Sequence, residues 1–156
     1  MVQLGQMTQK LEALGVKTLG VVATDPARAR LYFRFRRPRM PMGADPDLTT
    51  HRAFGLPNTP LPPNAMELAD QAAALELRLT GPVQGALKQL GRHDNYEVSE
   101  ADHADFDRHQ AQFTGQFLID REGIVRWVNV ECAREGLDGF GKFPSEEEML
   151  AAARAL

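Results

Sequence analysis

Apolar side chains recur at helical spacing over the first fourteen residues of the chain. One stripe of a helix is formed by Leu4, Met7, Leu11 and Leu14. Gly15 follows the stripe directly and suits the left-handed conformation with which many helices end. No Ser, Thr, Asp or Asn precedes the stripe, so the pattern predicts a helix that is already under way at Met1 and ends at Gly15.

The pattern then changes from helical to strand-like. Residues 16–23 (VKTLGVVA) are mostly apolar and rich in β-branched side chains, which predicts a strand buried on both faces of a partly parallel sheet. Asp25-Pro26 places a capping residue before a proline, and this pair predicts a helix that continues to about Phe35. A short apolar stretch at 40–43 predicts a second strand, and Asp45-Pro46 repeats the start signal for a helix that Gly55 ends.

A proline-rich segment separates this first part from a helical middle segment. Residues 57–63 (PNTPLPP) contain four prolines and interrupt any regular element. The helices expected after it cover 64–79, 82–90 and a stretch that opens at Ser99 with Asp102 in a capping box. We therefore expect residues 57–112 to be a helical insertion between two α/β parts.

The strongest hairpin signal in the chain lies at 117–130. The segment FLID is followed by Arg121-Glu122-Gly123 and then by the second apolar run, IVRWVNV. Gly123 suits the left-handed position of a bulged turn, so the three turn residues are given no catalytic role. After a glycine-rich loop, Ser145 and Glu148 predict a capped final helix that ends at Leu156.

Composition and charge narrow the class of protein. The chain has 156 residues, of which 43% are hydrophobic and 25% charged, and this is ordinary for a globular domain. Its net charge of −3 gives no reason to expect a nucleic-acid or membrane partner. There is no long apolar run and no secretory pattern at the N-terminus, so we expect a cytoplasmic protein.

Cysteine usage limits the redox chemistry. Cys132 is the single cysteine, which excludes an intramolecular disulfide, a C-x-x-C pair and a thiolate zinc cluster within one chain.

The order of elements, together with four sequence strings, resembles the AhpC/TSA redoxin (peroxiredoxin-like) family of the thioredoxin fold. The strings are GVKTLGVVATDP, MGADPDLTTHRAFGL, TGQFLIDREGIVRWVNVE and FPSEEEMLAAARAL, and the third is the most specific. They cover most of the chain outside residues 57–112. The resemblance implies an α/β fold with a thioredoxin-like mixed sheet flanked by helices. It also implies reduction of a peroxide or a disulfide by a reactive cysteine.

The chain departs from this family where the chemistry lies. Redoxins begin with a strand and place the reactive cysteine at the start of the first helix, where the helix dipole lowers the thiol pKa. This chain opens inside that helix, with neither the strand nor the cysteine. The family's arginine before the hairpin is missing from residues 113–116 as well, and Gly115 stands near the site of the thioredoxin cis-proline. The resemblance thus places Thr114 and Gly115 near the family's active-site loop but identifies no catalytic residue.

Two explanations fit these departures. In the first, which we favour, the chain is an N-terminally truncated redoxin or has a mis-assigned start, so that it is inactive as given. In the second, it is a non-catalytic thioredoxin-fold module in which the helical insertion binds a partner protein. In either case the strand at 16–23 has an unpaired edge, which favours a homo-oligomer. The thiol reductant and the partner protein are not identified.

Three further features have functional interpretations that we weigh against structural ones. Cys132 could be activated by Arg134, but it lies far from a redoxin nucleophile and is interpreted as structural. Residues 28–39 contain six arginines, which we interpret as the solvated face of a helix rather than a surface for RNA or phosphate.

The third feature is a group of histidines and aspartates in the insertion. Its members are His93, Asp94, Asp102, His103, Asp107 and His109. Only His103 and Asp107 have the i, i+4 spacing of a helical metal site, so we expect no metal and no cofactor.

Overall fold

The computed structural model describes residues 2–35, 37–59, 63–93 and 99–156. The chain is a mixed α/β protein that divides into two compact units. Unit 1 comprises Met1–Pro57 and Phe113–Leu156, and unit 2 comprises Asn58–Gln112.

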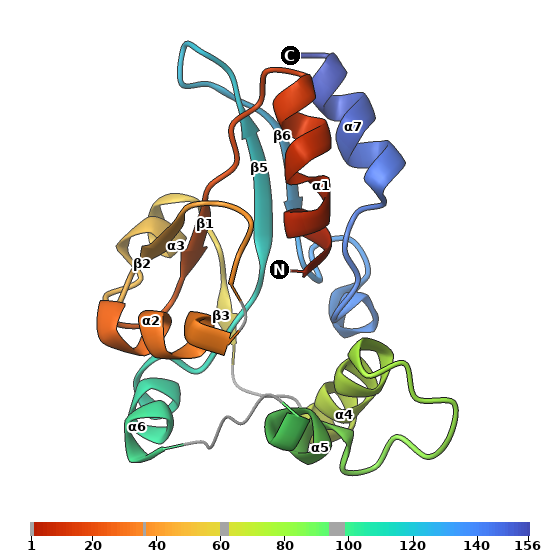
Figure 1. Ribbon diagram of the computed structural model, residues 1–156. Coiled ribbons are helices and arrows are strands. Elements are labelled where there is room, and N and C mark those ends of the chain that lie inside the picture. Colours follow the sequence, from red (N-terminus) through yellow and green to blue (C-terminus); the bar gives the residue numbers. More distant parts are fainter. Residues whose placement is uncertain (1, 36, 60–62, 94–98) are drawn as a thin grey trace. The chain divides into compact units, whose positions relative to one another are not determined.

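Unit 1 contains two pairs of strands and the helices around them (Figure 1). Its strands are β1 (Gly20–Val22), β2 (Met42–Ala44), β5 (Gly115–Ile119) and β6 (Val125–Val130). Its α-helices are α1 (Val2–Ala13), α2 (Pro26–Phe35), α3 (Thr49–Ala53) and α7 (Glu146–Arg154), and Gly136–Gly139 form a 3₁₀ turn, η1.

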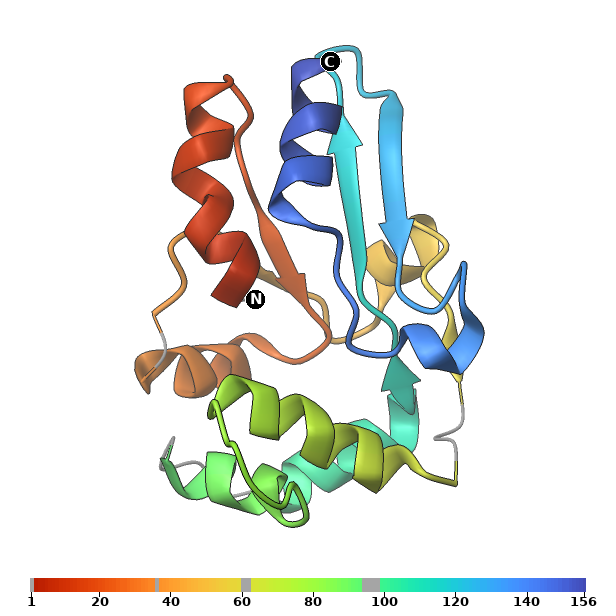
Figure 2. The ribbon, with the colours of Figure 1, turned by 90° about the vertical axis from the view of Figure 1, so that its right-hand side faces the viewer.

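The strands of unit 1 form two separate sheets in place of the expected single mixed sheet. β1 pairs with β2 in parallel, β5 pairs with β6 antiparallel, and among the described residues no strand joins the two pairs. β1 and β5 run in opposite directions (Figure 2). The strand expected over 16–23 is also shortened to three residues, because only Gly20–Val22 has a hydrogen-bonded neighbour.

The core of unit 1 lies between the hairpin and two helices. Its buried members are Met7 and Leu11 of α1, Leu118 of β5, and Met149 and Ala153 of α7. Trp127 stands opposite Leu118 across the hairpin and packs against this cluster. Side chains of α1 and α7 therefore cover the hairpin face that carries Leu118 and Trp127.

The predicted stripe of α1 is only partly buried. Leu14 was expected to continue the buried face, but the helix ends at Ala13 and 39% of the Leu14 surface is exposed. The side chain of Leu4 lies outside the described residues.

Two aspartates start the helices α2 and α3, in different ways. Asp25 Oδ1 accepts hydrogen bonds from the N–H groups of Ala27 and Arg28 at 2.7 and 3.0 Å, so α2 begins where the Asp-Pro pair predicts. The helix after Asp45 starts later than expected, at Thr49, because Leu48 takes a left-handed conformation with φ of 55°.

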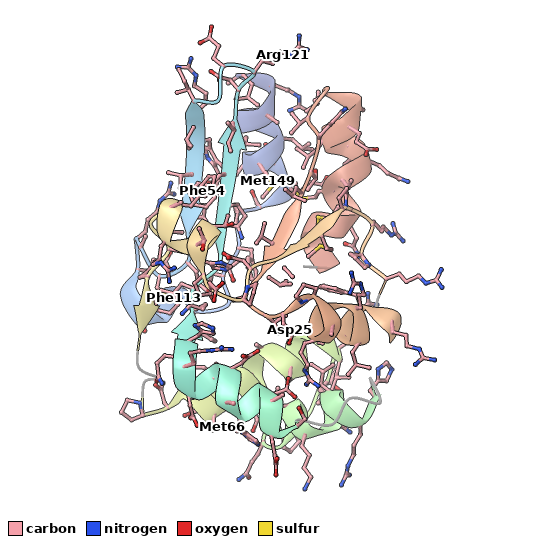
Figure 3. All side chains as sticks on the ribbon, turned by 90° about the vertical axis from the view of Figure 1, so that its left-hand side faces the viewer. Asp25, Phe54, Met66, Phe113, Arg121 and Met149 are labelled. Atoms are coloured by element: carbon pink, nitrogen blue, oxygen red, sulfur yellow. The ribbon has the colours of Figure 1, made fainter. Side chains whose placement is uncertain are left out.

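The hairpin turn has the predicted conformation. Gly123 has φ of 82°, the left-handed value that the bulged turn requires. The Asp120 carboxylate accepts the N–H groups of Glu122 and Ile124 at 2.9 Å. Hydrogen bonding from Ile124 is the main cause that lowers the pKa of Asp120, with the Arg126 side chain contributing. Arg121 lies at the tip of the hairpin (Figure 3).

Unit 2 is helical, with one short pair of strands. Its elements are β3 (Asn58–Thr59), α4 (Ala65–Glu76), α5 (Ala86–His93), α6 (Glu100–His109) and β4 (Ala111–Gln112), and β3 pairs with β4 antiparallel. Neither strand was expected from the sequence. The capping box of Ser99 and Asp102 at the start of α6 is confirmed.

A contact between α4 and α5 displaces the predicted start of α5. The helix was expected over 82–90, but it begins at Ala86 and continues through Gly91 to His93. The Asp70 carboxylate on α4 accepts the N–H groups of Gly85 and Leu87 at 2.7 and 2.9 Å. These two hydrogen bonds lower the pKa of Asp70, and the bond from Leu87 has the larger effect. The buried side chains Ala73, Ala74 and Ala86 then pack together.

Candidate functional site

Unit 1 contains a cavity between β1 and β5, which we name the inter-strand cavity. Its volume is about 330 Å³. The lining includes Val21 of β1, Phe117 of β5, Phe54 next to α3, Leu11 of α1 and Met149 of α7. Figure 3 labels Phe54 and Met149, which approach it from different elements. A smaller cavity of about 130 Å³ shares Val21 and Met149 with it.

Among the described residues, the backbone groups on both sides of the cavity have no strand partner. Gly20 donates its backbone N–H to Pro41, and the backbone C=O of Val22 accepts the N–H of Asp45, so the backbone groups of these two residues point toward β2. The backbone N–H and C=O of Val21, which lies between them, therefore point to the opposite edge of β1. On β5, Thr114 accepts the N–H of Glu131 in the hairpin ladder. The alternation of an antiparallel pair then turns the backbone groups of Gly115 and Phe117 away from β6, toward the cavity.

Two aromatic rings close one side of the cavity. The centroids of Phe54 and Phe117 lie 4.7 Å apart with the planes tilted by 59°. Because side chains alternate along a strand, Phe117 points to the opposite face of the hairpin from Leu118, which packs under α1 and α7. The cavity therefore has apolar side chains on both faces of the layer formed by the strands.

A buried aspartate–histidine pair contributes its histidine to the wall of this cavity. His51 lines the cavity, and its Nδ1 lies 3.1 Å from Asp45 Oδ2. The Asp45 carboxylate also accepts the N–H groups of Thr49 at 2.9 Å, Thr50 at 2.8 Å and His51 at 3.3 Å. Burial by itself raises the pKa of Asp45, but the hydrogen bonds from His51, Thr49 and Thr50 outweigh it and lower that pKa to about 2.

The sequence pattern predicts only a helix start at Asp45 and does not single out His51. A signal was present, because His51 follows Asp45 by six residues, within reach of the first turn of the helix that Asp45 caps.

Cys132 has the environment of a structural thiol. It follows β6, is partly buried and has φ of 63°. Burial is the main cause that raises the pKa of its thiol, and the negative charge of Glu131 raises it further. Arg134, the residue considered as its activator, instead places Nη1 at 3.9 Å from Glu148 Oε1. These contacts oppose formation of a thiolate at neutral pH.

Thr114 and Gly115 lie at the start of β5, where the resemblance placed the active-site loop. Thr114 donates its N–H to Glu131 Oε2 at 2.9 Å, and Glu131 is buried. The other carboxylate oxygen of Glu131, Oε1, accepts the N–H of Gly141 at 2.7 Å. Both backbone groups of Thr114 are thus hydrogen-bonded to Glu131. Gly115 lines the inter-strand cavity.

The arginine-rich segment only partly matches the predicted amphipathic helix. Arg30 and Arg34 lie on the exposed surface of α2, but Arg37 falls beyond the end of the helix. Leu31 was expected on the buried stripe, yet 42% of its surface is exposed, and the buried position is Ala29. The side chain of Phe35 lies outside the described residues.

The histidines of the insertion are distributed over two helices. His93 ends α5, whereas His103 and His109 lie on α6, and Asp94 is outside the described residues. Within the described part of the chain, no three His, Cys, Asp or Glu side chains are grouped so that they could hold a metal ion. Nor does any helix described here have the length and apolar character needed to cross a membrane.

Comparisons with known proteins identify no relative of this chain. No protein-family model matches the chain, and searches of curated proteins and of solved structures find no match.

Proposed function

We propose that this chain is a redoxin-like domain of the thioredoxin type that carries the scaffold of that class without its thiol chemistry. The observation that supports this best is the arrangement in unit 1: a parallel pair, β1–β2, connected through α2, and an antiparallel hairpin, β5–β6, followed by α7. The helices α1 and α7 pack side chains on one face of that hairpin.

The chemistry of the class, reduction of a peroxide or a disulfide, needs a thiolate that attacks oxygen or sulfur. Cys132 is poorly suited to this, because burial and Glu131 raise its pKa. On this proposal, catalysis would require a cysteine that these 156 residues do not supply.

The test is a peroxidase assay on the purified chain. Hydrogen peroxide consumption with a dithiol donor should equal the rate without protein, and Cys132→Ser should leave that rate unchanged. Arg134→Ala serves as the matched variant for the activation hypothesis and should also have no effect. Turnover above background that Cys132→Ser abolishes would contradict the proposal and make Cys132 the nucleophile.

A second candidate function is protein interaction through unit 2. The observation in its favour is a set of exposed large apolar side chains, including Met66, which is 65% exposed. The others are Leu79, Val83, Leu87 and Phe106. In-cell cross-linking should then give a discrete partner that Met66→Glu with Leu87→Glu removes, while the exposed control Glu67→Gln retains it. Identical cross-links from the double variant would exclude this surface.

A further inference from the structure

We infer that the inter-strand cavity is an acceptor site for one extended, apolar β-strand of another polypeptide, which pairs with β1 on one side and with β5 on the other. This goes beyond the proposed function, because it requires no thiol chemistry.

The backbone of the site supplies hydrogen-bonding groups on both sides. Val21 presents its N–H and C=O toward the cavity from β1, and Gly115 and Phe117 do so from β5. A strand placed between them would form main-chain hydrogen bonds on each of its two sides. Because β1 and β5 run in opposite directions, that strand is parallel to one of them and antiparallel to the other (Figure 2).

The side chains around the site define the chemistry of the occupant. Leu11 and Met149 lie on the face of the hairpin covered by α1 and α7. Phe54 and Phe117 lie on the opposite face. A strand between β1 and β5 thus meets apolar side chains on both of its faces, as the strands of parallel sheets do. Its sequence should be a continuous apolar run with β-branched residues, rather than an alternation of apolar and polar residues.

A buried hydroxyl provides an independent sign that a group is missing. Thr18 is one of the residues that line the cavity, and its Oγ1 is buried and has no hydrogen-bond partner among the described residues. Buried hydroxyls are normally hydrogen-bonded, so Thr18 Oγ1 lacks a usual partner close to the position that the incoming strand would take.

The site is open to a separate polypeptide. Leu19 next to β1 is 63% exposed and Ile119 at the end of β5 is 44% exposed, although both are apolar and line the cavity. A second copy of this chain is a poorer occupant, because each described strand is already paired with a neighbour and would have to leave its sheet.

The test uses the intact chain and a fluorescent peptide whose central five residues are Val and Ile, with lysines at both ends for solubility. Fluorescence anisotropy should show saturable binding at a single site. A peptide with proline at its centre lacks one N–H and should bind at least about tenfold more weakly.

Hydrogen exchange measured by NMR locates the bound strand. The amide protons of Val21 and Phe117 should exchange more slowly when the peptide is bound. The amide of Leu118 faces β6 and should not change, which provides an internal control. Leu19→Glu places a charge at the exposed mouth and should weaken binding about tenfold, whereas Val128→Glu, exposed on β6, should not.

Five outcomes would overturn the inference. These are no saturable binding, equal binding of the proline peptide, or unchanged exchange at Val21 and Phe117. The fourth is protection of both amides by self-association of the chain without peptide, which would make a second copy the occupant. The fifth is binding that appears only when the strand is fused to the N-terminus of the chain, which would exclude a separate polypeptide. None of these results depends on the thiol assays.

Discussion

At the scale of single residues, Asp45 has two structural roles. Its carboxylate accepts three backbone N–H groups at the start of α3 and also holds His51 in the wall of the inter-strand cavity. The two roles are coupled, because any change that removes the charge weakens the helix start and the histidine position together.

The Asp45 pair makes stability depend on pH. The pKa of Asp45 falls from 3.8 to about 2 in the folded chain, so the unfolded chain binds a proton more readily. The stabilisation is fully present above about pH 4, and it is lost as the pH falls toward 2. In urea titrations at several pH values, Asp45→Asn should flatten this dependence.

Asp47 provides the control for that experiment. It lies exposed in the same loop, so Asp47→Asn should preserve the acid-dependent loss of stability. An equal flattening by both variants would show that general charge, rather than the Asp45 pair, causes the dependence.

Cys132 should react slowly with alkylating reagents. Because burial and Glu131 raise its pKa, less thiolate is present at pH 8 than in the unfolded chain. Iodoacetamide labelling, followed by mass spectrometry, should therefore be slower in buffer than in urea. Faster labelling of the folded chain would contradict the structural role assigned to this thiol.

At the scale of elements, the β5–β6 hairpin depends on its contact with α1 and α7. Trp127 is only partly buried, but it packs against the cluster of Met7, Leu11, Leu118 and Met149. The hairpin has no other strand neighbour among the described residues, so this side-chain contact carries much of its stability.

Removal of the indole should destabilise unit 1 clearly. Trp127→Ala should lower the free energy of unfolding by about 3 kcal/mol, the low end for large aromatic residues, because the side chain is partly exposed. Chemical denaturation measures this loss. Val128→Ala on the exposed face should change stability by only about 0.5 kcal/mol, and equal effects at the two positions would contradict the packing.

At the scale of the whole molecule, local chemistry was predictable and contacts between distant segments were not. Asp25, Gly123 and Ser99 act on backbone within a few residues, so their elements follow from the sequence. The start of α5 depends on Asp70, fifteen residues before Gly85, and no local pattern carries it. For the candidate site, an unpaired edge of the strand at 16–23 was expected, but the position of β5 opposite that edge was not. The two strands are far apart in sequence, and no local pattern specifies which segments meet.

The two units should unfold as separate cooperative transitions. Each has its own buried cluster, one around Leu11 and one around Ala73. Leu11→Ala should cost about 2 to 5 kcal/mol in unit 1 and leave the unit 2 transition in place, as measured by hydrogen exchange on helix α4. Loss of protection in α4 together with unit 1 would show that the chain unfolds as one body.

The buried carboxylate of Glu131 determines where the chain can change length. It accepts the N–H of Thr114 at the start of β5 and the N–H of Gly141, which follows Glu131 by ten residues. The second hydrogen bond closes residues 131–141 into a ring. Extra residues inside that ring add only a small loop-closure cost, roughly 0.6 kcal/mol for each doubling. Beyond Gly141 the chain cannot take up extra residues in this way, because Phe143 and Pro144 line the smaller cavity and α7 begins at Glu146. Insertions at 133–138 should therefore be tolerated, whereas a single residue added between Gly141 and Ser145 would change the shape of that cavity.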